Sequence, residues 1–149
     1  MIATCESGSI VRPRECAELA RRAEGREIAA RVLARVRAFD VERERCDVGA
    51  HDWARERAND AGEDEVTIEV DLSAIRSDAD SAFDDAQVYR RGALVIIIGD
   101  ARLRPADGKC VMLARVARAV DGLDVEAYDK ALNVRRRFLG ETPISIARD

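Results

Sequence analysis

In this 149-residue chain, the side chains whose types and spacing best suit a metal-binding or catalytic role are three carboxylates. Glu69 and Asp71 point to the same side of one predicted strand, because side chains alternate along a strand. Asp100 follows the glycine that ends the apolar run of a second predicted strand. If the two strands are neighbours, the three carboxylates converge on a hard cation such as Mg²⁺, which prefers oxygen ligands. Such a site would support metal-assisted hydrolysis, as in a nuclease.

Cysteine and histidine add little further chemistry. The four cysteines, at positions 5, 16, 46 and 110, show no Cys-x-x-Cys spacing, and His51 is the one histidine, so a zinc cluster is excluded. Cys110 and His51 would form a nucleophile pair only if folding joined them. No complete catalytic constellation is present, and the three carboxylates also fit the solvated face of a surface strand. We therefore predict no catalytic residue and no cofactor, with Mg²⁺ as the alternative.

Charge is segregated along the chain. Residues 58–89 carry a net charge of −9, whereas residues 1–57 carry +1 and residues 90–149 carry +4. We expect this acidic block to contact a protein partner with a basic surface. Nucleic acid is disfavoured there, because phosphate-binding proteins rely on clustered Lys and Arg. The predicted partner-binding residues are Glu63, Asp64, Glu65, Asp78, Asp80, Asp84 and Asp85.

The elements that must position these groups are organised around the run GALVIIIG at 92–99, which is apolar on both faces. The run predicts a central strand over 93–103 that is covered above and below. The sequence Pro-Ala-Asp-Gly at 105–108 predicts a hairpin turn into a strand over 109–119. Strict alternation of apolar and polar residues predicts another strand over 65–72.

Apolar residues at helical spacing predict the remaining elements. A helix begins at Pro13, and the pattern continues to residue 39 with a kink or break near Gly25. Further helices are predicted over 52–61, 78–89 and 124–139, and residues 47–50 are interpreted as a turn. The predicted inner face of the last helix consists of Val125, Tyr128, Ala131, Leu132, Arg135 and Leu139.

These elements predict one α+β domain over 13–142, between a loose segment at 1–12 and a tail at 143–149. Its small, mainly antiparallel sheet is covered by helices. In the rival arrangement a crossover helix at 78–91 makes the first two strands parallel, and 109–120 is helical. The predicted order of elements resembles that of secretion chaperones, which bind an unfolded segment of another protein, although no motif is shared.

The function expected from these features is non-enzymatic protein binding, of an inhibitor-like or chaperone-like kind, through the acidic surface at 58–89. The competing class is a metal-dependent hydrolase or nuclease that uses Glu69, Asp71 and Asp100. A homodimer is a further alternative. No segment is apolar enough for a membrane span, and the first residues lack the pattern of a secretory signal, so we expect a cytoplasmic protein.

Overall fold

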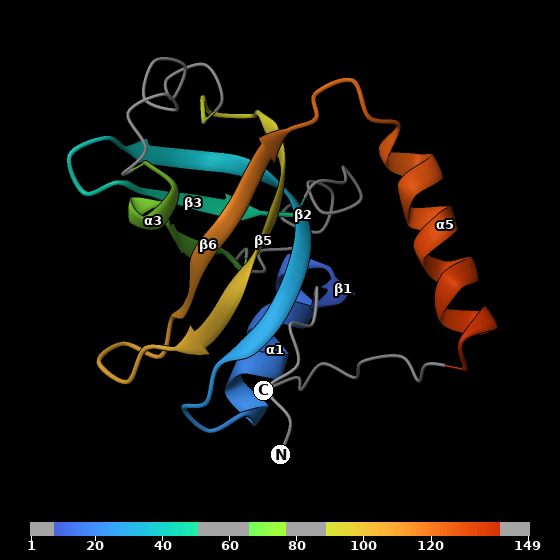
Figure 1. Cartoon of the computed structure of the whole chain (residues 1–149), viewed down its shortest axis with the longest axis horizontal. Coiled ribbons are helices and arrows are strands. Elements are labelled where there is room, and N and C mark those ends of the chain that lie inside the picture. Colours follow the sequence, from blue (N-terminus) through green and yellow to red (C-terminus); the bar gives the residue numbers. More distant parts are fainter. Residues whose placement is uncertain (1–7, 51–65, 77–88, 141–149) are drawn as a thin grey trace, which may run out of the picture.

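Strands account for most of the secondary structure in the computed structural model, which describes residues 8–50, 66–76 and 89–140 (Figure 1). In chain order the elements are β1 (Ser9–Val11), α1 (Pro13–Arg22), β2 (Ile28–Asp40), β3 (Arg45–Gly49), β4 (Ile68–Asp71), α3 (Ser73–Arg76), β5 (Leu94–Leu103), β6 (Cys110–Ala119) and α5 (Val125–Phe138).

Five of the described strands close into a barrel. Strand β2 pairs with β3, β3 with β4, β4 with β6, and β6 with β5, which returns to β2. The β4–β6 pair is parallel and the other four pairs of the ring are antiparallel. Strand β1 lies outside the ring and pairs in parallel with β2. A closed five-stranded barrel of this type is an OB-fold.

The prediction of an α+β sheet covered by helices is therefore wrong, chiefly because of β2 and β3. Along β2 the alternate residues Ala30, Val32, Ala34 and Val36 are all buried in the barrel core. Alanine is a strong helix former, so this two-residue period was obscured in the sequence, and Leu33 and Phe39 completed an apparent helical pattern. A helix does end before Gly25, but a strand follows it.

Strand β3 was also missed, because residues 47–50 were interpreted as a turn. Cys46 and Val48 alternate into the core with Asp47 between them, which is a strand pattern too short to stand out in the sequence. With β2 and β3 in place the sheet closes on itself. Closure, rather than a layer of helices, buries the inner face of the central strand, where Val95 and Ile97 are in the core. The resemblance to secretion chaperones fails for the same reason.

The local predictions around the hairpin are confirmed. Strands β5 and β6 pair in antiparallel register from Leu103 opposite Cys110, so the helical alternative for 109–120 is excluded. The turn is closed by the Arg104 N–H, which donates to the Lys109 carbonyl oxygen at 2.8 Å, and Gly108 adopts a φ of +70°. Strand β4 and the helix starting at Pro13 are confirmed as well. The helices predicted over 52–61 and 78–89 lie outside the described residues.

Helix α1 packs against one end of the barrel (Figure 1). Its buried face places Cys16 and Ala20 in the same core as the strand residues. Proline at its first position has no amide hydrogen to leave unpaired there. None of the helices in the described residues has the length and hydrophobicity of a membrane span.

Gly99 lies on β5 at a register shift of the β5–β6 pair, between Ile98 and Gly99, where the β6 backbone comes close. A Cβ atom added at Gly99 would lie 2.1 Å from the carbonyl oxygen of Leu113. That oxygen belongs to the backbone of β6, so it can move only if the strand moves. The close approach of the two strands therefore requires glycine.

We expect Gly99→Ala to lower the free energy of unfolding by about 2–3 kcal/mol, because the methyl group overpacks against backbone. Gly122→Ala is the matched control, since a Cβ at Gly122 meets nothing within 4 Å, and it should change stability by less than about 0.5 kcal/mol. Urea unfolding of both variants measures the difference. Equal effects would contradict the close β5–β6 contact at Gly99.

Candidate protein-interaction surface

Helix α5 lies beside the barrel and has two unlike faces (Figure 1). On the inner face Tyr128 and Arg136 are partly buried. Within the described residues, Leu132 is the one residue of α5 that is fully buried. The outer face carries an exposed stripe, hereafter the α5 stripe, with the helical spacing of four, three and four residues. The α5 stripe consists of Ala127, Ala131, Val134 and Phe138.

Local sequence signals explain why α5 forms where it does. The Asp124 carboxylate accepts a hydrogen bond from the Ala127 N–H at 3.1 Å, which caps the first turn. Arginines 135–137 occupy the last turn, where positive charge complements the helix dipole. Gly140 follows with a φ of +68°, a conformation suited to glycine at a helix end.

A polar anchor holds α5 to the N-terminal part of the chain. The Arg136 guanidinium donates to both carboxylate oxygens of Glu15 on α1, at 2.9 and 2.8 Å, and to the Ile10 carbonyl oxygen at 3.1 Å. The Arg12 guanidinium lies 3.6 Å from the Asp129 carboxylate. Both side chains of the central pair are well covered, with exposed fractions of 13% for Arg136 and 9% for Glu15. A bidentate pair of this kind fixes orientation as well as distance.

The charge of Glu15 depends on this anchor. Burial by itself raises the pKa of Glu15, but hydrogen bonds from Arg136 and the Arg12 N–H, with the positive charges of both side chains, outweigh burial. The pKa is therefore held below its ordinary value of 4.5. Glu15 stays ionised at neutral pH, and the ion pair with Arg136 is complete there.

The α5 stripe leaves large apolar side chains in solvent. Val134 is 58% exposed and Phe138 is 87% exposed, and Leu139, just beyond the helix, is 53% exposed. Scattered single apolar residues are normal on a protein surface, but an aromatic and two aliphatic side chains clustered at one helix end are typical of an interaction site. The geometry of α5 therefore suits docking of a protein partner.

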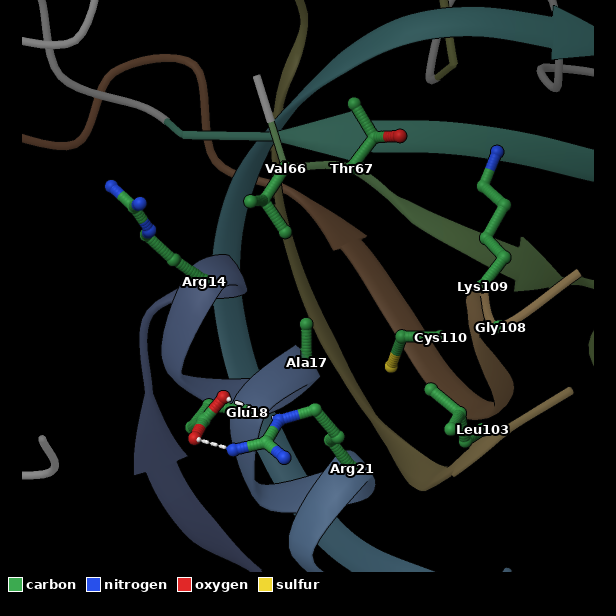
Figure 2. Close-up of a pocket in the computed structure, with 10 residues that line it drawn as sticks. All are labelled: Arg14, Ala17, Glu18, Arg21, Val66, Thr67, Leu103, Gly108, Lys109 and Cys110. Atoms are coloured by element: carbon green, nitrogen blue, oxygen red, sulfur yellow. Dashed lines mark hydrogen bonds and ion pairs between the residues drawn. The ribbon is translucent and has the colours of Figure 1, made fainter. Parts of the chain in front are cut away.

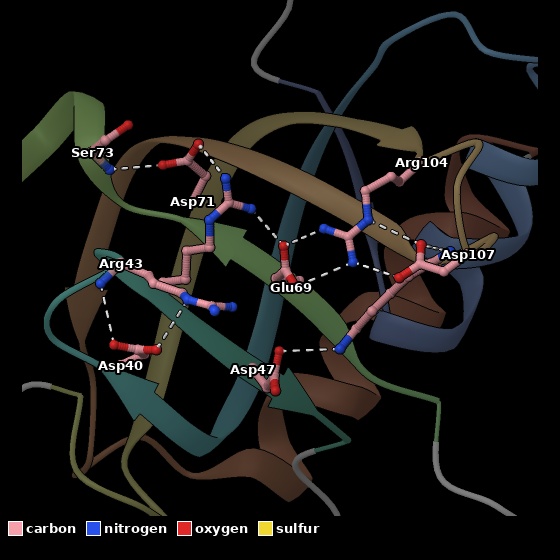
Figure 3. Close-up of polar contacts among 10 residues, drawn as sticks. Asp40, Arg43, Asp47, Glu69, Asp71, Ser73, Arg104 and Asp107 are labelled. Carbon is pink, nitrogen blue, oxygen red and sulfur yellow. Dashed lines mark hydrogen bonds and ion pairs between the residues drawn. The ribbon is translucent and has the colours of Figure 1, made fainter.

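A second feature is a network of ion pairs across β3, β4 and the turn between β5 and β6 (Figure 3). Arg45 and Arg104 each lie between two carboxylates, and Lys109 pairs with one, so these three positive charges are locally neutralised. The pairs are Arg45–Glu69, Arg45–Asp71, Arg104–Glu69, Arg104–Asp107 and Lys109–Asp47.

The network keeps its carboxylates ionised. Burial raises the pKa of Glu69, but hydrogen bonds from Arg104 and Arg45 outweigh it and lower the pKa overall. The hydrogen bond from Arg104 lowers the pKa of Asp107 to about 2. A general acid or base that works at neutral pH needs a pKa near that pH, so these groups suit structural ion pairing better than proton transfer.

The predicted metal ligands are only partly brought together. Glu69 and Asp71 share Arg45, whereas Asp100 lies on β5 and pairs with Arg115 at 3.5 Å. Strand β6 separates β4 from β5, which places the two strands about 9–10 Å apart. No group of three His, Cys, Asp or Glu residues in the described part of the chain is arranged to hold a metal ion. The Mg²⁺ site stays a prediction that this geometry does not favour.

A pocket of 470 Å³ lies between α1, the residues before β4 and the β5–β6 turn (Figure 2). Glu18 on its wall is bound by Arg21 and Arg22. The hydrogen bond from Arg21 is the main cause that lowers the pKa of Glu18 to about 2, so this carboxylate is not a base at neutral pH. Cys110 lines the opposite part of the pocket.

Sequence reasoning identified few of these residues. The seven acidic residues predicted to bind a partner, and His51, lie outside the described residues. On α5 the predicted inner face was partly wrong, because Ala131, Arg135 and Leu139 are exposed. The spacing of the α5 stripe was visible in the sequence and could have marked it. The Glu15–Arg136 pair carried no local signal, since 121 positions separate its members.

We expect Glu15→Gln to reduce the free energy of unfolding at pH 7 by about 1–3 kcal/mol, because Arg136 loses a charged hydrogen-bond partner. Since folding lowers the pKa of Glu15, its contribution is full above about pH 4.5, the unfolded pKa, and is lost as pH falls through the lower folded pKa. The stability difference between wild type and variant should therefore shrink on acidification. Chemical unfolding at several pH values measures it.

The matched control for this anchor is Glu126→Gln. Glu126 is an exposed α5 carboxylate that lies 3.8 Å from Lys130. Exposed pairs contribute little, so this variant should change stability by less than about 0.5 kcal/mol. The Glu15–Arg136 pair would not hold α5 if Glu15→Gln changed the free energy of unfolding as little as Glu126→Gln does. The same conclusion would follow if the effect of Glu15→Gln were constant from pH 7 to pH 3.

Comparison with known proteins places this surface in context. Residues 4–142 match the model of a family described as "Telomere-capping, CST complex subunit". The CST complex subunit TEN1 of Arabidopsis thaliana is 32% identical over 53 residues, which are 36% of this chain and 42% of the plant protein. The match thus covers less than half of that relative's length.

Solved structures are similar to this chain over most of its length. A crystal structure of yeast Stn1 and Ten1 is similar with a TM-score of 0.50 and 10% identity, over 93% of this chain and 77% of that chain. The S. pombe Stn1-ten1 complex is similar with a TM-score of 0.43 and 13% identity, over 75% and 71%. At such identities the yeast structure supports the fold alone. Because the family model matches nearly the whole length, the chain belongs to the telomere-capping CST complex subunit family.

Proposed function

We propose that this protein is a Ten1-like, non-enzymatic subunit of a telomere-capping complex and that it binds an Stn1-like partner through the α5 stripe. The observation that carries this proposal is the exposure of Val134 and Phe138 on a helix whose inner face is anchored by Arg136. The similar solved structure from yeast contains Stn1 together with Ten1, which supports the choice of partner.

The shape of the α5 stripe suits a helix of the partner. Ala127 and Ala131, in the first half of α5, are small and allow another backbone to approach closely. Val134 and Phe138, in the second half, supply the larger apolar side chains that anchor interfaces. The anchor to Glu15 fixes α5 before the partner arrives, so little ordering entropy is lost at that helix on binding.

The ion-pair network of β3, β4 and the β5–β6 turn favours protein over nucleic acid as the ligand. OB-folds that bind single strands use this region, with positive charge along the backbone path and aromatic rings under the bases. Here ion pairs with Glu69 and Asp47 neutralise Arg45, Arg104 and Lys109. Phe39 packs on Tyr89, with 5.3 Å between ring centroids.

The family description also bears on location. Capping takes place at chromosome ends, so we propose a nuclear site of action in place of the cytoplasmic one expected from the sequence. The pairing of Glu69 with two arginines agrees with a binding role.

We expect Phe138→Asp to weaken binding to the Stn1-like protein of the same organism by about 10- to 100-fold, because an interface anchor is replaced by a charge. The matched control is Val41→Asp at the β2–β3 turn, where Val41 is 57% exposed and also apolar. Calorimetric titration of both variants measures the difference. Equal affinities would contradict docking on α5.

The state of the isolated chain is a second control on the same surface. Sedimentation should show a monomer, since we assign the α5 stripe to a different protein. A homodimer that Phe138→Asp dissociates would assign the α5 stripe to self-association instead.

We further propose that the acidic block at 58–89 speeds the encounter with a basic partner surface. Exposed charges are screened over about 8 Å at physiological salt, so association should slow as salt rises from 50 to 500 mM. Reversal of Asp84 and Asp85 to Lys should slow it at low salt and leave the melting temperature unchanged. Stopped-flow association rates that respond neither to salt nor to the reversal would remove the acidic block from binding.

A further inference from the structure

The outward side of the β5–β6 hairpin is a surface that the proposed contact with an Stn1-like partner does not use. Side chains alternate along a strand, so Val95 and Ile97 of β5 and Met112 of β6 point into the core and their neighbours point outward. Because the two strands are paired in register, the outward side chains form one surface, hereafter the hairpin face. It consists of Ile96, Ile98, Asp100, Arg102, Leu113, Arg115, Val116 and Arg118.

A β-bulge widens this surface on β6. Gly99 is opposite Ala114 and Ile98 is opposite Val116, so Arg115 has no partner residue on β5. The extra residue of a bulge shifts the alternation of the side chains. Arg115 and Val116 are accordingly both exposed, although they are consecutive in the strand.

Aliphatic side chains occupy the middle of the hairpin face. Leu113 and Val116 are 42% and 40% exposed, and Ile96 and Ile98 are partly buried. Ile98 and Val116 are cross-strand neighbours, so these side chains form a continuous apolar strip. A contiguous apolar strip on the solvent side of a sheet is more typical of a contact site than single scattered apolar residues are.

Positive charge borders the apolar strip. Arg115 lies 3.5 Å from the Asp100 carboxylate, whereas Arg102 and Arg118 form no ion pair within the described residues. Three arginines against one aspartate give the hairpin face a net charge of +2. In the ion-pair network of β3, β4 and the β5–β6 turn, by contrast, the arginines are neutralised. The hairpin face therefore attracts an anionic ligand.

The aliphatic strip favours a protein over a nucleic acid as that ligand. Single-stranded nucleic acids bind where aromatic rings stack under the bases, and the residues of the hairpin face include no aromatic ring. A phosphate backbone would leave the aliphatic side chains in water. A segment that carries both carboxylates and aliphatic side chains would satisfy the charge and the apolar strip together.

We propose that the hairpin face binds an acidic segment of a second protein partner, in which carboxylates alternate with aliphatic side chains. Strand β5 is paired with β2 on one side and with β6 on the other, so the segment lies across the sheet and does not join it as a strand. Ile96, which is opposite Arg118, and Arg102 are six positions apart on β5, or about 20 Å. An extended segment of about seven residues therefore reaches from Arg118 to Arg102.

This contact is separate from the α5 stripe. Figure 1 shows α5 to one side of β6, and none of the residues of the hairpin face belongs to α5. One molecule can therefore hold the Stn1-like partner on α5 and the acidic segment on the hairpin at the same time. Either contact can be absent without the other.

The test measures fluorescence anisotropy of a labelled 12-residue peptide of alternating glutamate and valine during titration with the whole chain. We expect saturable binding that weakens as salt rises, because the attraction is partly between exposed charges. Peptides with glutamine in place of glutamate, or with serine in place of valine, should each bind at least about 10-fold more weakly. A 12-nucleotide oligothymidine should also bind more weakly than the glutamate–valine peptide.

Reversal of the two unpaired arginines locates the site. Arg102→Glu combined with Arg118→Glu should weaken peptide binding by about 10-fold or more, because attraction becomes repulsion at both ends of the face. The melting temperature should not change, since neither side chain holds an ion pair in the described structure. Arg43→Glu is the matched control, because Arg43 is 80% exposed at the β2–β3 turn, and it should change the affinity by less than about 2-fold.

Other occupants of the hairpin face give different results. Failure of the wild-type chain to bind the glutamate–valine peptide, or tighter binding of the oligothymidine, would overturn the proposal. Phe138→Asp should leave the peptide affinity unchanged, and a loss would assign the peptide to the α5 stripe instead. Reversal of Asp84 and Asp85 to Lys should also leave it unchanged, and a gain would mean that the acidic block of the chain itself occupies the hairpin face.

Discussion

The pairing of β2 with β5 is the constraint on which the rest of the structure depends. Eight consecutive residue pairs join the two strands, from Ile28 opposite Ala101 to Arg35 opposite Leu94. Because β2 is 13 residues long, its later part is still available to pair with β3. This β2–β5 pairing, hereafter the seam, closes into a ring what would otherwise be an open sheet with two edges. The ring encloses the core.

Closure also decides where the helices can go. With the interior filled by strand side chains, α1 covers one end of the barrel and contributes Cys16 and Ala20 to the core. Helix α5 adds one buried residue, Leu132, within the described part of the chain, and its Arg136 donates to Glu15 on α1. A helix anchored by an oriented ion pair can leave an apolar face in solvent. The ion pair fixes the position of α5, and the exposed α5 stripe remains available for contact with a partner.

What could be predicted from the sequence was the structure encoded by neighbouring residues. The Pro-Ala-Asp-Gly turn determines the β5–β6 hairpin, and Asp124 with Gly140 brackets α5. Strand β2 could not be recognised, because alternating alanines fit a helix as well as a strand. Its identity is settled by partners 59 to 73 positions away on β5.

The candidate site was predicted even less completely, and for the same reason. The carboxylates Glu69 and Asp71 were recognised as polar strand residues, but their arginine partners come from other strands and from the turn. Helical periodicity identified α5 without showing which of two adjacent stripes meets the barrel. In the sequence Arg136 is one of three consecutive arginines at a helix end, and only the fold shows that it is the anchor.

The most direct test of the central claim, that closure of the barrel presents α5 to a protein partner, is amide hydrogen exchange with and without the Stn1-like protein. In the isolated chain, residues 28–35 and 94–101 should exchange most slowly, since they form the seam. On binding, exchange should slow over residues 125–139. Fast exchange along the seam, or protection on binding confined to β3, β4 and the β5–β6 turn with α5 unchanged, would contradict it.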